Sequence, residues 1–172
     1  KQRLVKEGKI KKDKHESVIF RRDNSHYEKL DGIERCIDDE IPFEIPKNWK
    51  WTRFGQVISL LSGTDFKPEE YNDKQQGVPY ITGASSLSEH GVLINRWTEV
   101  PRVIVNRGDV LLVCKGSGYG KTVICDIDEA HIARQIMAIK KMTTLDMPYI
   151  RVFLQANFEQ IKSKGQGVIP GI

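Results

Sequence analysis

Several short segments rich in Val, Ile and Leu constrain the fold more than any other feature of the chain. Four of them follow one another at residues 103–105, 109–114, 122–126 and 135–140, and another lies at 78–82. Polar or glycine-containing stretches separate them. Runs of this length and composition, bounded by turn residues, are typical of β-strands. We therefore predict a framework of short strands joined by turns and loops.

Apolar residues recur at helical spacing in two other places. One set is Phe54, Val57, Ile58 and Leu61, followed by Gly63; the other is Ile150, Phe153, Leu154, Phe158 and Ile161, preceded by Asp146 and followed by Gly165. Each set predicts a short amphipathic helix, because an acidic N-cap residue and a glycine at the end are common helix boundaries. The predicted fold class is α+β: mixed or antiparallel sheet, a few short helices and long loops.

The first part of the chain reads as a connector. An Asp31-Gly32 pair between two short segments favours a tight hairpin. Pro42 and Pro46 disfavour helix and central strand, so we expect extended chain there. We assign residues 1–48 to a linker that contains a hairpin, and residues 49–172 to the main domain.

Three tryptophans are candidates for stacking on nucleic-acid bases. Trp49 and Trp51 lie at the entry to the main domain, where we expect them to wedge into its core. Trp97 lies in the long irregular stretch 83–101, where stacking and packing are both open.

Charge is unevenly distributed along the 172 residues. The formal net charge is +4, but residues 1–14 carry seven basic and two acidic side chains, residues 15–101 carry ten and fifteen, and residues 102–172 carry ten and six. An overall basic chain suggests nucleic-acid binding. The acidic middle indicates that such binding would be confined to a local basic patch.

Other protein classes are not supported by the sequence. No apolar run approaches the ~20 residues that span a bilayer, and no apolar segment follows the basic N-terminus as in a signal peptide. The sparse cysteines Cys36, Cys114 and Cys125 fit a reducing cytoplasm better than a disulfide framework, and Cys114 and Cys125 are expected to be buried thiols and not metal ligands. Both ends of the chain are expected to be cuts in a longer protein.

A glycine-rich loop between two predicted strands is the main candidate site. Residues 115–122 read KGSGYGKT, which resembles a P-loop but lacks its first glycine at the required spacing. A P-loop also opens a helix, whereas a strand-like segment follows here. A plain hairpin turn is one interpretation. A loop that presents lysines and backbone to a polyanion is the one we favour.

The order of the short motifs resembles the target recognition domains of type I restriction–modification specificity subunits. Such domains typically open with a proline, a Trp-x-Trp pair and a Phe-Gly or Leu-Gly pair, which here are Pro46, Trp49, Trp51, Phe54 and Gly55. Later matches are Ser62-Gly63, residues 77–81, residues 107–111, residues 116–118, Arg134-Gln135 and residues 165–172. Where this chain has Arg134, the family often has Asn.

The resemblance implies a DNA-reading domain, the second of two in a specificity subunit and truncated at its C-terminus. Residues 1–48 would join it to a conserved spacer helix. It would read one half of a bipartite target in double-stranded DNA, in the cytoplasm of a prokaryote and in the service of host defence. The chain itself would have no catalytic residue, metal or cofactor. S-adenosylmethionine, ATP and magnesium would be used by partner methyltransferase and restriction/translocase subunits.

We predict DNA contacts from the glycine-rich loop and from segments expected near it. The predicted residues are Lys115, Gly116, Ser117, Gly118, Tyr119, Lys121, Arg134, Gln135, Lys162, Lys164 and Gln166. The lysines at 115, 121 and 162 are assigned to phosphates; Ser117, Tyr119, Arg134 and Gln135 are assigned to base edges. Two alternatives stay open: a nucleotide-binding enzyme that uses residues 115–122, and a protein-interaction module that uses the acidic segment 28–44.

Overall fold

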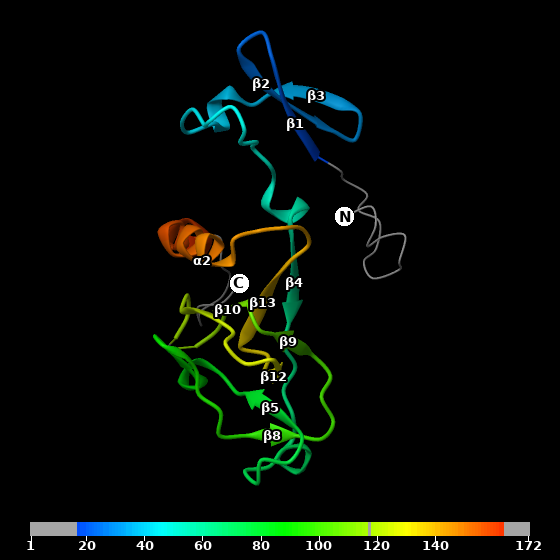
Figure 1. Cartoon of the computed structure of the whole chain (residues 1–172), viewed down its shortest axis with the longest axis vertical. Helices are drawn as coiled ribbons and strands as arrows, with labels where there is room; N and C mark the ends of the chain where they lie inside the picture. Colours follow the sequence, from blue (N-terminus) through cyan, green and yellow to red (C-terminus); the bar gives the residue numbers. More distant parts are fainter. Residues whose placement is uncertain (1–16, 117, 164–172) are drawn as a thin grey trace. The chain divides into compact units, whose positions relative to one another are not determined.

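The computed structural model describes residues 17–116 and 118–163. The chain divides into two compact units, Lys1–Ile58 and Ser59–Ile172 (Figure 1). The division falls at the start of strand β4, later in the chain than Trp49. The assignment of residues 1–48 to a linker stays a prediction, and its first part lies outside the described residues.

The first unit contains a three-stranded antiparallel sheet, β1-β2-β3. Its strands are β1 (Ser17–Arg22), β2 (Ser25–Leu30) and β3 (Ile33–Cys36). The hairpin predicted at Asp31-Gly32 is confirmed, and both residues have positive φ angles, 52° and 85°. The β1–β2 turn, which the sequence analysis did not identify, has the same character at Asp23 and Asn24. Positive φ at both central positions gives a turn whose twist matches that of the strands.

A buried carboxylate ties the following segment to this sheet. Glu28 on β2 is 2 % exposed and accepts hydrogen bonds from Arg53, Arg35 and Ser17. The hydrogen bonds from Arg53, more than those from Ser17 and Arg35, hold the pKa of the Glu28 carboxyl well below its usual range. Arg35 and Arg53 also both pair with Glu40. The unit is therefore organised around an ion-pair cluster.

The entry segment is less buried than predicted. Trp49 is 58 % exposed, so the expectation that it wedges into the core is wrong. Trp51 is half-buried, and its ring packs against Phe43 with the centroids 5.3 Å apart.

The second unit is built on two four-stranded sheets (Figure 1). Their orders are β11-β10-β13-β4 and β8-β5-β12-β9. The strands are β4 (Ile58–Ser62), β5 (Val78–Ile81), β8 (Trp97–Thr98), β9 (Ile104–Asn106), β10 (Val110–Val113), β11 (Thr122–Ile124), β12 (Glu129–Ile132) and β13 (Ile136–Lys141). A small hairpin of β6 (Leu87–Ser88) and β7 (Gly91–Val92) lies between β5 and β8 in sequence. β5 and β12 are parallel, whereas the pairs β10–β11, β10–β13, β9–β12 and β5–β8 are antiparallel.

These sheets and the helices below confirm the α+β class. All five predicted strands form, with bounds within a few residues of those expected. β12 is a strand that was not among those predicted, and it begins at Glu129, close to Asp126 and Asp128. In the fold, Ala130, His131 and Ile132 on β12 are all fully buried. Pairing on both sides with β5 and β9 decides the conformation of this segment.

The helix predicted from Phe54, Val57, Ile58 and Leu61 is wrong. A short 3-10 turn, η2 (Phe54–Gln56), leads instead into β4. β4 pairs beside β13, so tertiary pairing overrides the local helical spacing. Gly63 does not cap a helix: a Cβ atom there would lie 2.1 Å from the Ala133 carbonyl oxygen. Glycine is needed because the two backbones approach closely.

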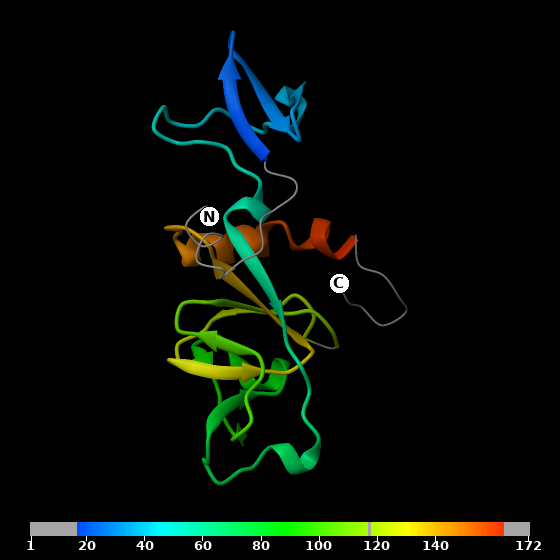
Figure 2. The same ribbon diagram turned by 90° about the vertical axis from the view of Figure 1, so that its right-hand side faces the viewer.

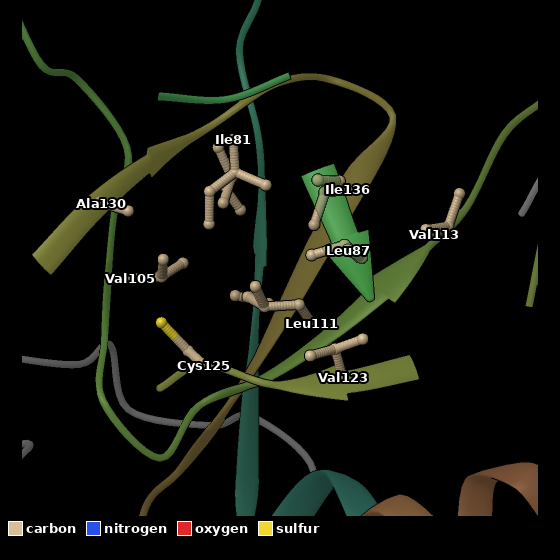
Figure 3. Packing of buried hydrophobic residues seen from close by; sticks show 11 residues of the cluster. Ile81, Leu87, Val105, Leu111, Val113, Val123, Cys125, Ala130 and Ile136 are labelled. Carbon is tan, nitrogen blue, oxygen red and sulfur yellow. The ribbon is translucent and has the colours of Figure 1, made fainter. Parts of the chain in front are cut away.

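The main core of the second unit contains side chains from both sheets (Figure 3). Ile81, Val105, Leu111, Val113, Val123, Ala130 and Ile136 are among its buried members. All four residues of β10 are buried. Since successive side chains on a strand point to opposite faces, Leu111 and Val113 face this core while Val110 and Leu112 face the other side.

The helix predicted from Asp146 to residue 163 forms as two pieces, α2 (Met147–Ala156) and α3 (Phe158–Ser163) (Figure 2). The predicted N-cap is confirmed, since the Tyr149 N–H donates to Asp146 Oδ1 at 2.9 Å. α2 packs against β10 and β11 with Met147, Ile150 and Leu154 buried. Phe153, predicted to join that face, is exposed. The predicted stop at Gly165 lies outside the described residues.

Candidate nucleic-acid interface

The segment 114–121, which we call the glycine loop, joins the paired strands β10 and β11, and its described residues are 114–116 and 118–121. The Gly120 N–H donates to the Val113 carbonyl, and the Tyr119 N–H to that of Gly116. Gly116 and Gly120 have φ angles of +84° and +89°, which glycine adopts at little cost. Thr122 begins a strand, so no helix N-terminus stands behind the loop as it does behind a P-loop.

Two glycines of the loop are needed for packing. A Cβ atom on Gly118 would lie 2.3 Å from Cβ of Ala84, and one on Gly120 would lie 2.1 Å from the Phe158 ring. Ala84 belongs to the 3-10 turn η4 (Ala84–Ser86) and Phe158 begins α3. The glycine loop thus packs closely against both η4 and α3. A Cβ atom on Gly116 would meet only Gln135 Oε1, at 3.9 Å, and Gly116 is exposed.

Tyr119 and Lys121 hold the loop in place. The Tyr119 ring packs edge-on against Phe158 with the centroids 5.3 Å apart. Its hydroxyl is buried and finds no hydrogen-bond partner among the described residues, and this burial raises the pKa of the hydroxyl. The Lys121 ammonium donates to the Leu87 carbonyl oxygen. Lys115, in contrast, is exposed, and the described part of the chain offers it no ion-pair partner.

Arg134 and Gln135 lie at the tip of a tight turn, Ala133–Ile136, which we call the Arg134 turn. Its backbone is pinned on several sides. The Ala133 N–H donates to the Ile81 carbonyl and the Ile136 N–H to that of Ala133. The Gln135 carbonyl accepts from the Cys114 N–H of the glycine loop. Both tip side chains are exposed on this fixed backbone.

Gln135 brings three segments together. Its Oε1 atom lies 2.8 Å from the position that a Cβ on Gly83 would take, and 3.9 Å from that position at Gly116. Arg134 is held by Asp65, whose carboxylate accepts from the Arg134 backbone N–H at 2.9 Å and lies 3.1 Å from Nε. We call Lys115, Gly116, Arg134 and Gln135 the contact face, because they are exposed and adjoining.

The fold therefore brings most of the predicted residues together. Gly118, Tyr119 and Lys121 lie beneath or beside the contact face. Lys162 is exposed on α3, 3.8 Å from Glu159, and α3 reaches the glycine loop through Phe158. Ser117, Lys164 and Gln166 lie outside the described residues.

Sequence reasoning missed the residues that support the contact face. Asp65 lies 69 positions from Arg134, and no spacing or motif links the two. His131 is fully buried and accepts at Nδ1 from the backbone N–H groups of Arg102 and Val103. Its Nε2 lies 2.7 Å from the Thr64 carbonyl. Burial is the main cause that lowers the pKa of the imidazole.

The described residues contain neither a group of metal ligands nor a membrane-spanning helix. Within 17–116 and 118–163, no three His, Cys, Asp or Glu side chains are grouped as metal ligands would be. Cys114 and Cys125 are buried, and burial raises the pKa of the Cys114 thiol to about 11. The helices of this same part are too short or too polar to cross a bilayer.

The chain is similar in sequence to two curated proteins of Escherichia coli. It is 33% identical to the type I restriction enzyme EcoAI specificity subunit over 103 residues, which is 60% of this chain and 14% of that protein. It is 31% identical to the EcoEI specificity subunit over 137 residues, which is 75% of this chain and 20% of that protein. The chain thus spans a fifth or less of these relatives. No protein-family model matches it.

Solved structures share the fold. An HsdS subunit from Thermoanaerobacter tengcongensis superposes with a TM-score of 0.64 at 20% identity, over 76% of this chain and 34% of that one. A chain from a structure on complex assembly and conformational transition of the type I R-M system gives a TM-score of 0.67 at 20% identity, over 76% and 32%. The S subunit of a type I system from M. genitalium gives 0.52 at 18% identity, over 76% and 33%.

Proposed function

We propose that this chain, a relative of the type I restriction enzyme specificity subunits, is a target recognition domain that reads one half of a bipartite sequence in double-stranded DNA. The observation that carries the proposal is the contact face. Arg134 and Gln135 stand exposed on a backbone pinned by hydrogen bonds, beside Lys115. Arg and Gln are side chains that make bidentate contacts to purines in the major groove.

The contact face divides the work of binding between two kinds of contact. Lys115 and the exposed backbone at Gly116 suit phosphates, which position the protein on the duplex. Arg134 and Gln135 suit base edges, which specify the sequence. Ser117, Lys162, Lys164 and Gln166 are proposed as further contacts. Tyr119, Lys121 and Gly118 contribute by fixing the loop, since their packing partners are on the protein.

The chain acts in this proposal without chemistry of its own. Methylation with S-adenosylmethionine and ATP-dependent translocation with magnesium belong to partner methyltransferase and restriction/translocase subunits, in the cytoplasm of the host. A nucleotide-binding enzyme is the weaker reading, because the glycine loop joins two paired strands and does not open a helix. A protein-interaction role through residues 28–44 is also weaker, because Glu28 and Glu40 are occupied by arginines.

The test is equilibrium binding by the full-length protein that carries this chain, with its methyltransferase partners. Labelled duplexes with random sequence would be titrated at several salt concentrations. We expect salt-sensitive binding, and enrichment of a defined half-site after selection. Equal binding to all duplexes after selection would overturn the proposal.

A further inference from the structure

We infer that Asp65 orients Arg134 so that the arginine reads one guanine of the half-site from the major groove. The inference rests on the proposed function and deepens it, because it names a base and a positioning residue. The Asp65 carboxylate contacts Arg134 at two points.

The two contacts fix both the backbone and the side chain of the arginine. Oδ1 of Asp65 accepts from the backbone N–H of Arg134 at 2.9 Å, and Oδ2 lies 3.1 Å from Nε. Asp65 thus forms an ion pair on the Nε side of the guanidinium, which leaves its two terminal amino groups to other partners. The Arg134 side chain is 71% exposed, so these groups face solvent.

Asp65 is itself anchored by its two neighbours in sequence. The Thr64 N–H donates to the Ile132 carbonyl, and the Thr64 carbonyl is held by His131. Phe66 is buried, and its ring lies 4.1 Å from that of His131 and 5.1 Å from that of Tyr80. Both neighbours of Asp65 are therefore held in place by the fold, as is the Arg134 turn that its carboxylate contacts.

This arrangement suits a base better than a phosphate. A guanidinium whose remaining donors form a fixed fork matches O6 and N7 of guanine, and a pre-oriented side chain loses less conformational freedom on binding. The adjacent carboxylate offsets the positive charge, which weakens attraction to a phosphate. Lys115 has no such counter-charge among the described residues and is the better phosphate contact.

The experiment is selection of duplexes from a randomised library by the full-length protein with its partners, followed by sequencing. Wild type would be compared with Arg134→Ala, Asp65→Asn and Asp65→Ala. Arg107→Ala is the matched control, because Arg107 Nε also pairs with an exposed carboxylate, that of Asp128, at 2.8 Å. Thermal unfolding of each variant would be measured beside the selection.

We expect one position of the wild-type half-site to be guanine. Arg134→Ala should lower the preference for guanine there by about tenfold or more. Asp65→Asn and Asp65→Ala should relax the same position by about threefold to tenfold, with the other positions kept. Arg107→Ala should leave the motif unchanged.

Three results would overturn the inference while leaving DNA recognition intact. One is a half-site unaffected by Arg134→Ala, and another is a loss of affinity equal for all sequences, which would make Arg134 a phosphate contact. The third is an unchanged motif in both folded Asp65 variants. If wild type selects no motif, the proposed function fails first and this inference fails with it. If both Asp65 variants unfold, a guanine preference retained in Arg134→Gln would count against it, because the glutamine amide matches adenine and not guanine.

Discussion

The Nε2 of His131 lies 2.7 Å from the carbonyl oxygen of Thr64, the residue before the one that grips Arg134. Nδ1 accepts hydrogen bonds from two backbone N–H groups. The neutral ring therefore carries its proton on Nε2, which donates a hydrogen bond to the Thr64 carbonyl. A single buried side chain therefore joins β12 to the segment that holds Asp65 and to the segment at Arg102.

Replacing His131 with Phe should destabilise the second unit. The substitution leaves the Thr64 carbonyl and the N–H groups of Arg102 and Val103 without their partner, at a cost of about 3 kcal/mol. Chemical denaturation would measure the change. His90→Phe, at an exposed position, is the control and should change stability by less than about 0.5 kcal/mol. An equal loss of stability in the two variants would show that the hydrogen bonds of the His131 ring do not stabilise the fold.

Stability should also fall in mild acid because of His131. Burial lowers the pKa of this histidine in the folded state, so the unfolded chain binds the proton more readily. The free energy of unfolding should then decrease as the pH falls below about 6.5, the ordinary histidine value. Unfolding measured from about pH 7.5 to about pH 5, a range that includes this value, would detect the decrease. His131→Phe should show a smaller decrease, and an identical slope in both proteins would rule out His131 as the cause.

The glycine loop offers a test of its packing. Gly120→Ala places a Cβ against the Phe158 ring at a position where φ is +89°, whereas Gly108→Ala meets open space at φ +91°. The two share the backbone strain of about 1 kcal/mol, so the excess in Gly120→Ala reports the clash. We expect Gly120→Ala to be more destabilising by about 1–3 kcal/mol. Equal losses of unfolding free energy in the two variants would mean that α3 does not pack against the glycine loop.

The buried carboxylate of the first unit should be essential to that unit. Glu28→Gln would remove the buried charge that both arginines contact and leave Glu40 as the counter-charge they share, at a cost of about 2 kcal/mol. Glu34→Gln is the control, because Glu34 forms an exposed pair with Arg22 worth less than about 1 kcal/mol. Hydrogen exchange of β2 and β3 amides would measure both. Similar exchange in the two variants would contradict the central role of Glu28.

Lys115 should contribute a sequence-independent contact to DNA. Lys115→Ala removes one phosphate contact, so the slope of log affinity against log salt should fall by about 0.9. Lys141→Ala, an exposed lysine at the end of β13, is the control and should leave the slope unchanged. A slope unaffected by Lys115→Ala would remove this residue from the contact face.

The strands could be predicted because their composition is local information. The segments at 109–114 and 135–140 need no distant partner to be recognised as strands. β4 and β12 could not be predicted, because pairing with β13 and with β5 and β9 decides their conformation. Their own residues favour helix or turn.

Parts of the candidate site are recognisable in the sequence for the same reason. The glycine loop and the Arg134-Gln135 pair stand out in the sequence, and the fold brings them together. The roles of their neighbours do not stand out. The packing of Tyr119 against Phe158 and the hydrogen bond from Lys121 to the Leu87 carbonyl could not be predicted from the sequence, and nothing in it marks Asp65 as the partner of Arg134.

The most direct test of the account is to map methylated motifs in cells that express the complete system. Wild type would be compared with a hybrid in which residues 59–172, the second compact unit, come from a related specificity subunit of known target. The account predicts a split motif in wild type and a hybrid motif in which one half changes while the other half and its methylated base are kept. A motif that is unchanged in an active hybrid would contradict the claim that this chain reads DNA sequence.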